Sequence, residues 1–216
     1  MENKQIIAII SLPILFLVMY PVFQILKNKI GNIELYGKNR AWYVGIIIYW
    51  IFWCLIYPII ILDSNQLYKT MIPGQIGLSG IIFLFFPIMI TFIGRYFFKF
   101  EKITNRKELI VLSSSAIIMG TVEEILWRGV FIVFFPGNIL WGLLWPTVWF
   151  SIWHLAPGSI SIVNKWMLAI GALAFGLCWG VTAFLTGSIF WTIISHISVG
   201  LIRVLNIERE NAYRLM

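Results

Sequence analysis

The sequence predicts an all-α fold, a polytopic membrane bundle of about seven transmembrane helices. Of the 216 residues, 60% are hydrophobic and only 12% are charged, whereas a soluble domain carries about 25% charged residues. Such a chain has too few polar side chains to cover its surface in water, so we interpret it as an integral membrane protein. Its apolar runs are continuous rather than alternating, which excludes the strand pattern of a membrane β-barrel and favours helices.

Seven apolar stretches are long enough to cross about 30 Å of hydrocarbon at about 1.5 Å per residue. The first is too long for a cleavable signal peptide and has no small-residue cleavage site after it. The two cysteines lie within apolar runs and are interpreted as packing residues. The predicted spans are residues 5–26, 42–62, 76–98, 109–135, 138–156, 166–186 and 188–205.

The lysines and arginines predict the orientation of the bundle, because cytoplasmic loops of membrane proteins are enriched in them. Most of the 16 basic residues lie in four segments on one side: 27–41, 95–108, 157–165 and 203–214. The opposite side carries only Lys4 and Lys69. With an odd number of spans, the N-terminus is predicted outside and the C-terminus in the cytoplasm. The net charge of +7 is therefore a topology signal, and no nucleic-acid partner is needed to explain it.

Two adjacent carboxylates and an arginine lie inside the fourth predicted span, as Glu123, Glu124 and Arg128. A charge at the centre of a membrane helix costs about 2.5–3.5 kcal/mol on insertion scales, so such residues are functional-site candidates. The four-residue spacing predicts that Arg128 pairs with Glu124 as a structural partner. Glu123 lies about 100° around the helix and is expected to point to a different neighbour.

Both histidines of the chain also fall within predicted spans, His154 in the fifth and His196 in the seventh. Counted from the tight outer turns at about 1.5 Å per residue, Glu123, His154 and His196 lie at depths of roughly 20, 24 and 13 Å. The three residues are therefore predicted to converge in one depth band. A structural role explains any single one of them as well as a functional role does, but their joint occurrence favours a site.

A carboxylate beside two imidazoles could act as a general base that deprotonates a water molecule for attack on a carbonyl carbon. The second imidazole could then stabilise the oxyanion or protonate the leaving amine. We predict no cofactor. A divalent metal that activates water is a second way to use the same groups, although the H-E-x-x-H spacing of zinc peptidases is absent. A Ser-His-Asp system is not indicated, since the single aspartate, Asp63, falls in an outer loop.

The motif Glu123-Glu124-x-x-x-Arg128, followed by Phe150-x-x-x-His154 and a histidine in a later span, resembles the CAAX protease and bacteriocin-processing family, also called the Abi group. The resemblance covers the fourth to seventh spans. It divides the chain into three segments: N-terminal transmembrane helices with cytoplasmic basic loops (1–108), a four-helix catalytic core (109–205) and a short cytoplasmic tail (206–216).

The resemblance implies a glutamate-dependent intramembrane endopeptidase. In it, Glu123 activates water, His154 assists, and His196 helps to form the oxyanion site. Phe150 lies one helical turn from His154 and is expected to shape the pocket, although plain packing explains it equally. The third family motif is commonly H-x-x-x-N, whereas this chain has Gly200 at the asparagine position. Nearby hydroxyl groups could supply the missing donor: Thr192, Ser195 or Ser198.

Two functions follow from the sequence. The first is hydrolysis of a peptide bond in a membrane-associated peptide or protein precursor, in bacteriocin or pheromone maturation or in self-immunity, at a bacterial cell membrane. The alternative is a non-enzymatic immunity or regulatory protein that binds a partner membrane protein. A proton-coupled transporter fits less well because no internal repeat is evident. The substitution Glu123→Gln discriminates between the peptidase and the non-enzymatic protein, since it keeps the shape of the side chain and removes the base.

Overall fold

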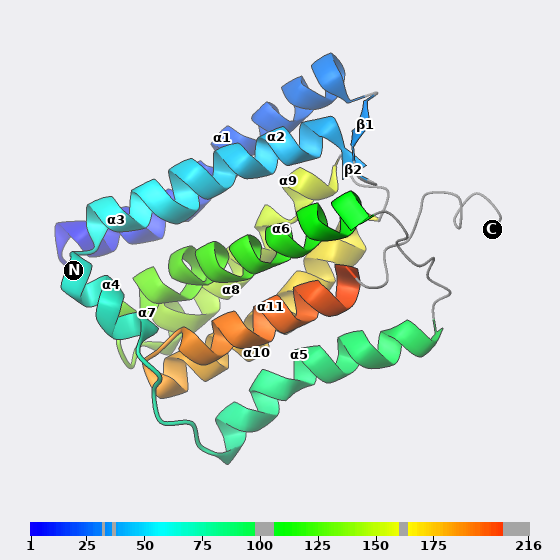
Figure 1. The fold of residues 1–216 in the computed structure, drawn as a ribbon. Coiled ribbons are helices and arrows are strands. Elements are labelled where there is room, and N and C mark those ends of the chain that lie inside the picture. Colours follow the sequence, from blue (N-terminus) through cyan, green and yellow to red (C-terminus); the bar gives the residue numbers. More distant parts are fainter. Residues whose placement is uncertain (32, 36–37, 98–105, 160–163, 205–216) are drawn as a thin grey trace.

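The computed structural model describes residues 1–31, 33–35, 38–97, 106–159 and 164–204. They form a bundle of mostly antiparallel helices (Figure 1), which confirms the predicted fold class. In chain order the elements are α1 (Asn3–Ile30), β1 (Glu34–Leu35), β2 (Lys38–Asn39), α2 (Arg40–Tyr49), η1 (Trp50–Ile56), α3 (Tyr57–Ile61), α4 (Ser64–Met71), α5 (Leu78–Phe97), α6 (Arg106–Glu124), η2 (Ile125–Gly129), α7 (Val130–Phe134), η3 (Ile139–Leu144), α8 (Trp145–Trp153), α9 (Leu155–Gly158), α10 (Lys165–Thr186) and α11 (Phe190–Val204).

Each predicted span coincides with a helical segment of the bundle. Two of these seven segments, α5 and α11, are shorter apolar helices over the described residues. Large apolar side chains cover the outer faces of the helices, as at Leu17 and Ile60, which are 69% and 72% exposed. Such a surface suits lipid rather than water, and the protein is a membrane protein. Five segments are long and apolar enough to cross a bilayer: Asn3–Ile30, Arg40–Ile61, Arg106–Phe134, Ile139–Gly158 and Lys165–Thr186.

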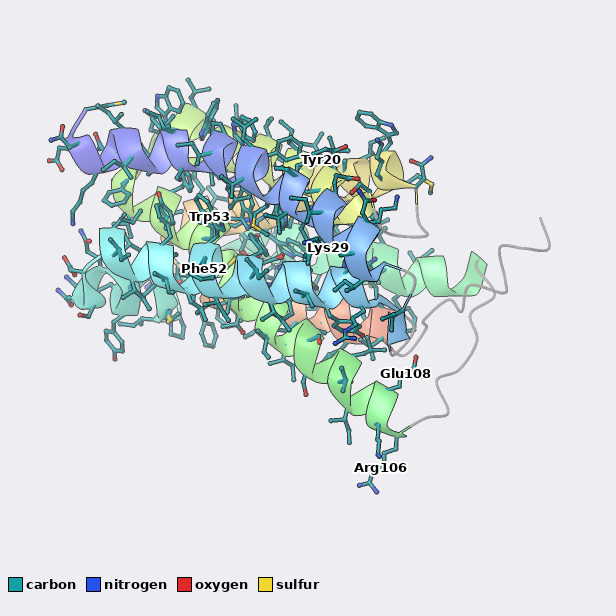
Figure 2. The ribbon with its side chains drawn as sticks, turned by 90° about the horizontal axis from the view of Figure 1, so that it is seen from above. Tyr20, Lys29, Phe52, Trp53, Arg106 and Glu108 are labelled. Atoms are coloured by element: carbon teal, nitrogen blue, oxygen red, sulfur yellow. The ribbon has the colours of Figure 1, made fainter. Side chains whose placement is uncertain are left out.

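The ends of the helices fall into two groups at opposite ends of the bundle (Figure 1). The connection from α1 to α2, the start of α6, α9 and the end of α11 gather at one end, and α4 and α7 lie at the other. Arg106 projects away from the bundle at the start of α6 (Figure 2). The described parts of the basic segments therefore share one end. Which end faces the cytoplasm stays a prediction, and the tail 206–216 lies outside the described residues.

Two short elements between the first three spans were not predicted from the sequence. The helix α4 begins after Asp63, whose Oδ1 accepts a hydrogen bond from the backbone N–H of Gln66 at 2.7 Å, a helix cap that satisfies a free donor. The carbonyl oxygen of Thr70 in α4 accepts from the N–H of Ile189 at 2.8 Å. This helix therefore fastens the turn between α10 and α11. The other element is the two-stranded antiparallel hairpin β1–β2.

Three of the membrane helices contain a π-helical segment, η1, η2 or η3. A π-helical turn is rare, and it occurs frequently at functional sites because it redirects the side chains that follow. The segment η2 begins directly after Glu124 and contains Arg128. The irregular turn therefore lies within the predicted charged motif.

The helices α6 and α11 approach each other closely because small residues line their contact. A Cβ added to Gly120 would lie 2.8 Å from the backbone nitrogen of Ile197, a separation that side chains essentially never show. A Cβ added to Gly200 would lie 3.0 Å from the Cβ of Ala116. Because His196 precedes Ile197 in the chain, this close approach fixes where that histidine lies relative to α6.

Candidate active site

The helix α6 buries a row of side chains at four-residue spacing, which ends in the two glutamates. Ala116 and Gly120 are the small members of this row, and they let α11 pack against the helix. Glu123 and Glu124 are 3% and 0% exposed. Two carboxylates so deep in an apolar bundle need compensating partners, because an unpaired buried charge is costly.

Glu124 has two such partners. As the spacing predicts, Arg128 Nη1 donates to Glu124 Oε1 at 3.0 Å. The same oxygen lies 2.8 Å from Nδ1 of His196. Because the carboxylate beside a guanidinium accepts hydrogen bonds, Nδ1 carries the hydrogen. Arg128 Nη2 also donates to the carbonyl oxygen of Gly176 at 3.2 Å, so Glu124, Arg128 and α10 form one network.

Glu123 lies on the other side of the same histidine. Its Oε2 is 3.9 Å from Nε2 of His196, which is too long for a direct hydrogen bond. This oxygen accepts no hydrogen bond from any residue that the structure describes. The indole N–H of Trp50 faces the Glu123 carboxyl from η1, and it too lacks a partner among the described residues. Buried polar atoms without protein partners are the positions where a reactant or a bound water is held.

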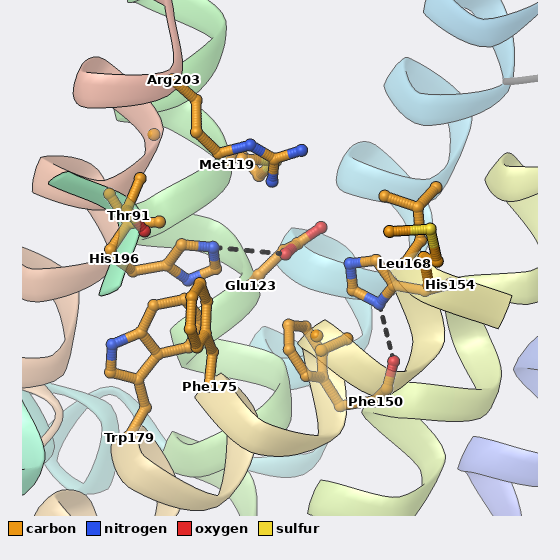
Figure 3. Close-up of a pocket in the computed structure, with 15 residues that line it drawn as sticks. Thr91, Met119, Glu123, Phe150, His154, Leu168, Phe175, Trp179, His196 and Arg203 are labelled. Atoms are coloured by element: carbon orange, nitrogen blue, oxygen red, sulfur yellow. Dashed lines mark hydrogen bonds and ion pairs between the residues drawn. The ribbon is translucent and has the colours of Figure 1, made fainter. Parts of the chain in front are cut away.

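His154 lies at the end of α8, where the helical hydrogen bonding is interrupted. Pro157 has no N–H to donate to the carbonyl of Trp153. The backbone N–H of His154 donates to the carbonyl oxygen of Ser151, three residues back, at 3.1 Å. His154 Nδ1 lies 2.8 Å from the carbonyl oxygen of Phe150. A carbonyl oxygen only accepts, so Nδ1 carries the hydrogen and Nε2 of the neutral ring presents a lone pair. Figure 3 shows the Glu123 carboxylate between the rings of His154 and His196.

The three predicted catalytic residues line one cavity of about 290 Å³. Its walls are otherwise mostly apolar, and Met167, Leu168 and Arg203 line it from the start of α10 and the end of α11. These two helix ends lie at the end of the bundle that carries the basic segments (Figure 1). The convergence predicted from helix depth is therefore present, and the cavity reaches from Glu123 toward the basic end.

Aromatic rings surround the polar residues on the side of α10. The ring of Trp179 stacks on the imidazole of His196 with centroids 4.0 Å apart and 18° between the planes. The Arg128 guanidinium lies over the ring of Phe150 at 4.5 Å, so Phe150 contacts both the charged network and His154. Phe150 lines the cavity. The sequence did not single out Trp179, because nothing in composition separates it from the other tryptophans of the chain.

Metal ligation was left open by the sequence. In the described ranges, no group of three or more His, Cys, Asp or Glu side chains is placed to hold a metal ion.

The comparison with protein families bears on this site. Residues 105–202 match the family model described as Type II CAAX prenyl endopeptidase Rce1-like. Over this segment the chain is similar to the CAAX protease family. The match includes every motif residue that suggested the resemblance, from Glu123 to His196. Because that family is one of proteases, the match supports the interpretation of this membrane protein as a hydrolase. Searches of curated proteins and of solved structures found no match.

Gly200 departs from the usual third motif of the CAAX protease family, and the structure gives a physical reason. It lines the cavity, so an asparagine side chain here would reach the site. However, the added Cβ would lie 3.0 Å from Ala116 Cβ, tighter than most real contacts. The glycine and the close contact between α6 and α11 therefore go together. Residue 200 itself therefore has no side chain that could donate to an oxyanion.

Proposed function

We propose that the protein is an intramembrane glutamic endopeptidase that hydrolyses a peptide bond with water activated by Glu123. The observation that carries the proposal is the position of the Glu123 carboxylate in the cavity. It lies between two imidazoles, and its Oε2 has no hydrogen-bond donor among the described residues. A general base needs a free oxygen within reach of the proton that it removes.

His154 is proposed to help hold the attacking water. With Nδ1 bonded to the Phe150 carbonyl, its Nε2 lone pair accepts a hydrogen bond, as a water molecule between His154 and Glu123 requires. Glu123 takes one proton from that water, and the hydroxide forms a bond to the carbonyl carbon of the substrate. Holding both reactants in place removes much of the entropic barrier of this step.

His196 is proposed to stabilise the oxyanion that then forms. Its Nδ1 is engaged with Glu124, so Nε2, which faces Glu123, is the nitrogen that reaches the cavity. Glu123 and His196 are proposed to share one proton. Because the charges of Glu124 and Arg128 cancel, the four residues then have no net charge, whether the proton is on Glu123 or on His196. When the proton is on His196, Nε2–H donates to the oxyanion, and such donors contribute about 10²–10³ in rate.

The reaction closes with transfer of a proton to the leaving group. As the tetrahedral intermediate collapses, the bond from carbon to nitrogen breaks, and the amine nitrogen takes the proton that Glu123 removed from water. The products are a new carboxyl terminus and a free amine. Glu123 returns to the carboxylate form, ready for the next water.

The substrate is proposed to be a membrane-associated peptide or protein precursor. The cavity supports this because its walls are largely apolar and it reaches the end of the bundle with the basic segments. Positive loops favour the cytoplasmic side, so we place this end and the C-terminus in the cytoplasm of a bacterial cell membrane, with the N-terminus outside. Maturation of a bacteriocin or pheromone, or self-immunity, is the proposed setting.

The test compares peptides from host cells that carry the wild type, Glu123→Gln or the control Glu108→Gln. Glu108 is a buried carboxyl at the other end of α6, so its change controls for loss of an acidic side chain from this helix. Protein levels are matched, and membrane and secreted peptides are measured by mass spectrometry. We expect one cleaved peptide to vanish and its precursor to accumulate in Glu123→Gln alone. Unchanged peptides together with a surviving immunity phenotype would favour the alternative, a non-enzymatic protein that binds a partner membrane protein.

A further inference from the structure

Trp179 of α10 makes the closest and most parallel ring contact with a residue of the site. Its centroid lies 4.0 Å from that of His196, with 18° between the planes. The other ring contacts of Trp179, with Phe150 and Phe175, are edge-on at 6.4 and 5.9 Å. The indole is 2% exposed. It therefore covers one face of the imidazole and excludes other neighbours from that face.

The indole is itself held in place by a hydrogen bond to Ser195 of α11, and Ser195 is bonded in turn to α5. Its Nε1–H donates to Ser195 Oγ at 3.0 Å, and the Ser195 hydroxyl donates to the carbonyl oxygen of Leu84 at 2.7 Å. Ser195 precedes His196 in the chain, so Trp179 is attached to two successive residues of α11. This chain of bonds fixes the ring in the membrane interior, where a broken hydrogen bond is costly to replace.

The same indole also lies near the other donor to Glu124. The guanidinium carbon of Arg128 is 5.6 Å from the Trp179 ring, within the range of a cation–π contact. Both residues that donate to the Glu124 carboxylate, Arg128 and His196, therefore contact one aromatic surface. An imidazole held only through Nδ1 can rotate about its last side-chain torsion, which has broad minima. The stacked indole removes that freedom.

We infer that Trp179 is a positioning residue for His196. It holds the imidazole in the plane that directs Nδ1 to Glu124 and Nε2 toward Glu123, and its π face favours the positively charged ring that donates to the oxyanion. The kinetic part of this inference rests on the proposed function, whereas the ring orientation does not. The two parts are therefore tested by separate measurements.

The first measurement is NMR of the protein with isotope-labelled histidine in lipid nanodiscs. The chain has only two histidines, and His154→Gln assigns the signals. The stacked indole is expected to shift the His196 ring protons upfield through its ring current. In Trp179→Leu this shift is lost, whereas Trp179→Phe keeps most of it and Trp149→Leu leaves it unchanged. Identical His196 signals in the wild type and Trp179→Leu overturn the inference, whether or not the protein cleaves peptides.

The second measurement is the kinetics of cleavage of the precursor peptide by the same variants. Loss of a cation–π contact of up to about 2 kcal/mol predicts a fall in kcat on the order of 10–30-fold for Trp179→Leu, with KM within twofold. Trp179→Phe should restore most of kcat, because it keeps an aromatic face. Where Trp179→Leu does not accumulate, Ser195→Ala replaces it, and a several-fold lower kcat with a second His196 signal is expected. A variant that loses stability but keeps the wild-type kcat overturns the inference.

Discussion

The two parts of the bundle differ in what they bury. Setting the aromatic and cysteine side chains aside, the buried polar side chains in the described residues before position 98 are Ser11 and Thr70. After position 105 they are Glu108, Glu123, Glu124, Arg128, Thr147, Thr182, Ser188, Thr192, Ser195 and His196. Ionisable groups inside a membrane are expensive and are retained where they have a function. We therefore propose that the first part acts as a scaffold and that the second part carries the chemistry.

The first part nevertheless contacts the site, both through Trp50, whose indole N–H faces the Glu123 carboxyl, and through Tyr49. The Tyr49 hydroxyl accepts a hydrogen bond from the Trp127 indole N–H at 2.7 Å, and its ring stacks on Trp153, the neighbour of His154, at 4.0 Å. Changes in the first part should therefore lower stability alone, whereas changes in the second part, which holds the buried charges, can lower stability, kcat or both. The following predictions test this division, from the largest effect to the smallest.

The largest expected effect is on stability and follows from breaking the ion pair of Glu124. Arg128→Met leaves a buried carboxylate without its guanidinium, which costs about 3–5 kcal/mol. Thermal unfolding in detergent should show a strongly lowered Tm. The double variant with Glu124→Gln should recover part of the loss because it removes the unpaired charge. Losses that simply add in the double variant would show that the pair is not coupled.

The next effect is on activity and follows from the close contact of α6 with α11. Gly120→Ala places a Cβ 2.8 Å from the backbone nitrogen of Ile197, so α11 has to shift and carry His196 with it. A misplacement of about 1 Å can cost 10²-fold in rate, and we expect kcat to fall by that order. Gly94→Ala in α5 is the control, since its added Cβ has no described atom within 4 Å. Equal kcat values for the two variants would contradict the proposed geometry.

A smaller effect, confined to stability, is expected in the scaffold. Tyr49→Phe removes the acceptor for the buried indole N–H of Trp127, and an unsatisfied buried donor costs about 1–3 kcal/mol. The free energy of unfolding should fall by this amount while kcat per folded molecule stays the same. Tyr20→Phe on α1 controls for loss of a hydroxyl. A large fall in kcat without loss of stability would place Tyr49 in the chemistry instead.

The smallest effect concerns the asparagine that this chain lacks. Gly200→Asn alone should lower kcat several-fold, because its Cβ meets Ala116 at 3.0 Å. Combining it with Ala116→Gly removes this contact and leaves the Cα of residue 116 at 3.5 Å from the new Cβ. The double variant should then match or exceed the wild-type kcat, since the amide supplies an oxyanion donor. A double variant as slow as the single one would show that the cavity has no use for this donor.

Much of the arrangement could be predicted from the sequence because the membrane constrains it strongly. Hydropathy located the seven helical segments, and the high cost of intramembrane charge drew attention to Glu123 and the two histidines. Helix rise alone then placed these residues at similar depths. The pairing of Glu124 with Arg128 followed from their spacing, which both an α-helical and a π-helical turn keep on neighbouring faces.

What could not be predicted depends on lateral packing. Hydropathy gives the depth of a residue but not its direction around the helix, so the bond from His196 to Glu124 was not foreseen. The π-helical segments have no distinct residue signal in this apolar chain. The stack of Trp179 on His196 depends on how closely α10 and α11 approach. The sequence contains 11 tryptophans and does not indicate which of them makes this contact.

The central claim is that Glu123 is the base of a hydrolysis reaction. Its most direct test is kcat of the purified protein in liposomes, measured on the peptide whose cleavage depends on it in cells. General-base catalysis contributes about 10²–10⁴-fold, so Glu123→Gln should lower kcat by that factor with an unchanged Tm, while Glu108→Gln stays near the wild type. A Glu123→Gln protein that is folded and cleaves within threefold of the wild-type rate would contradict the account.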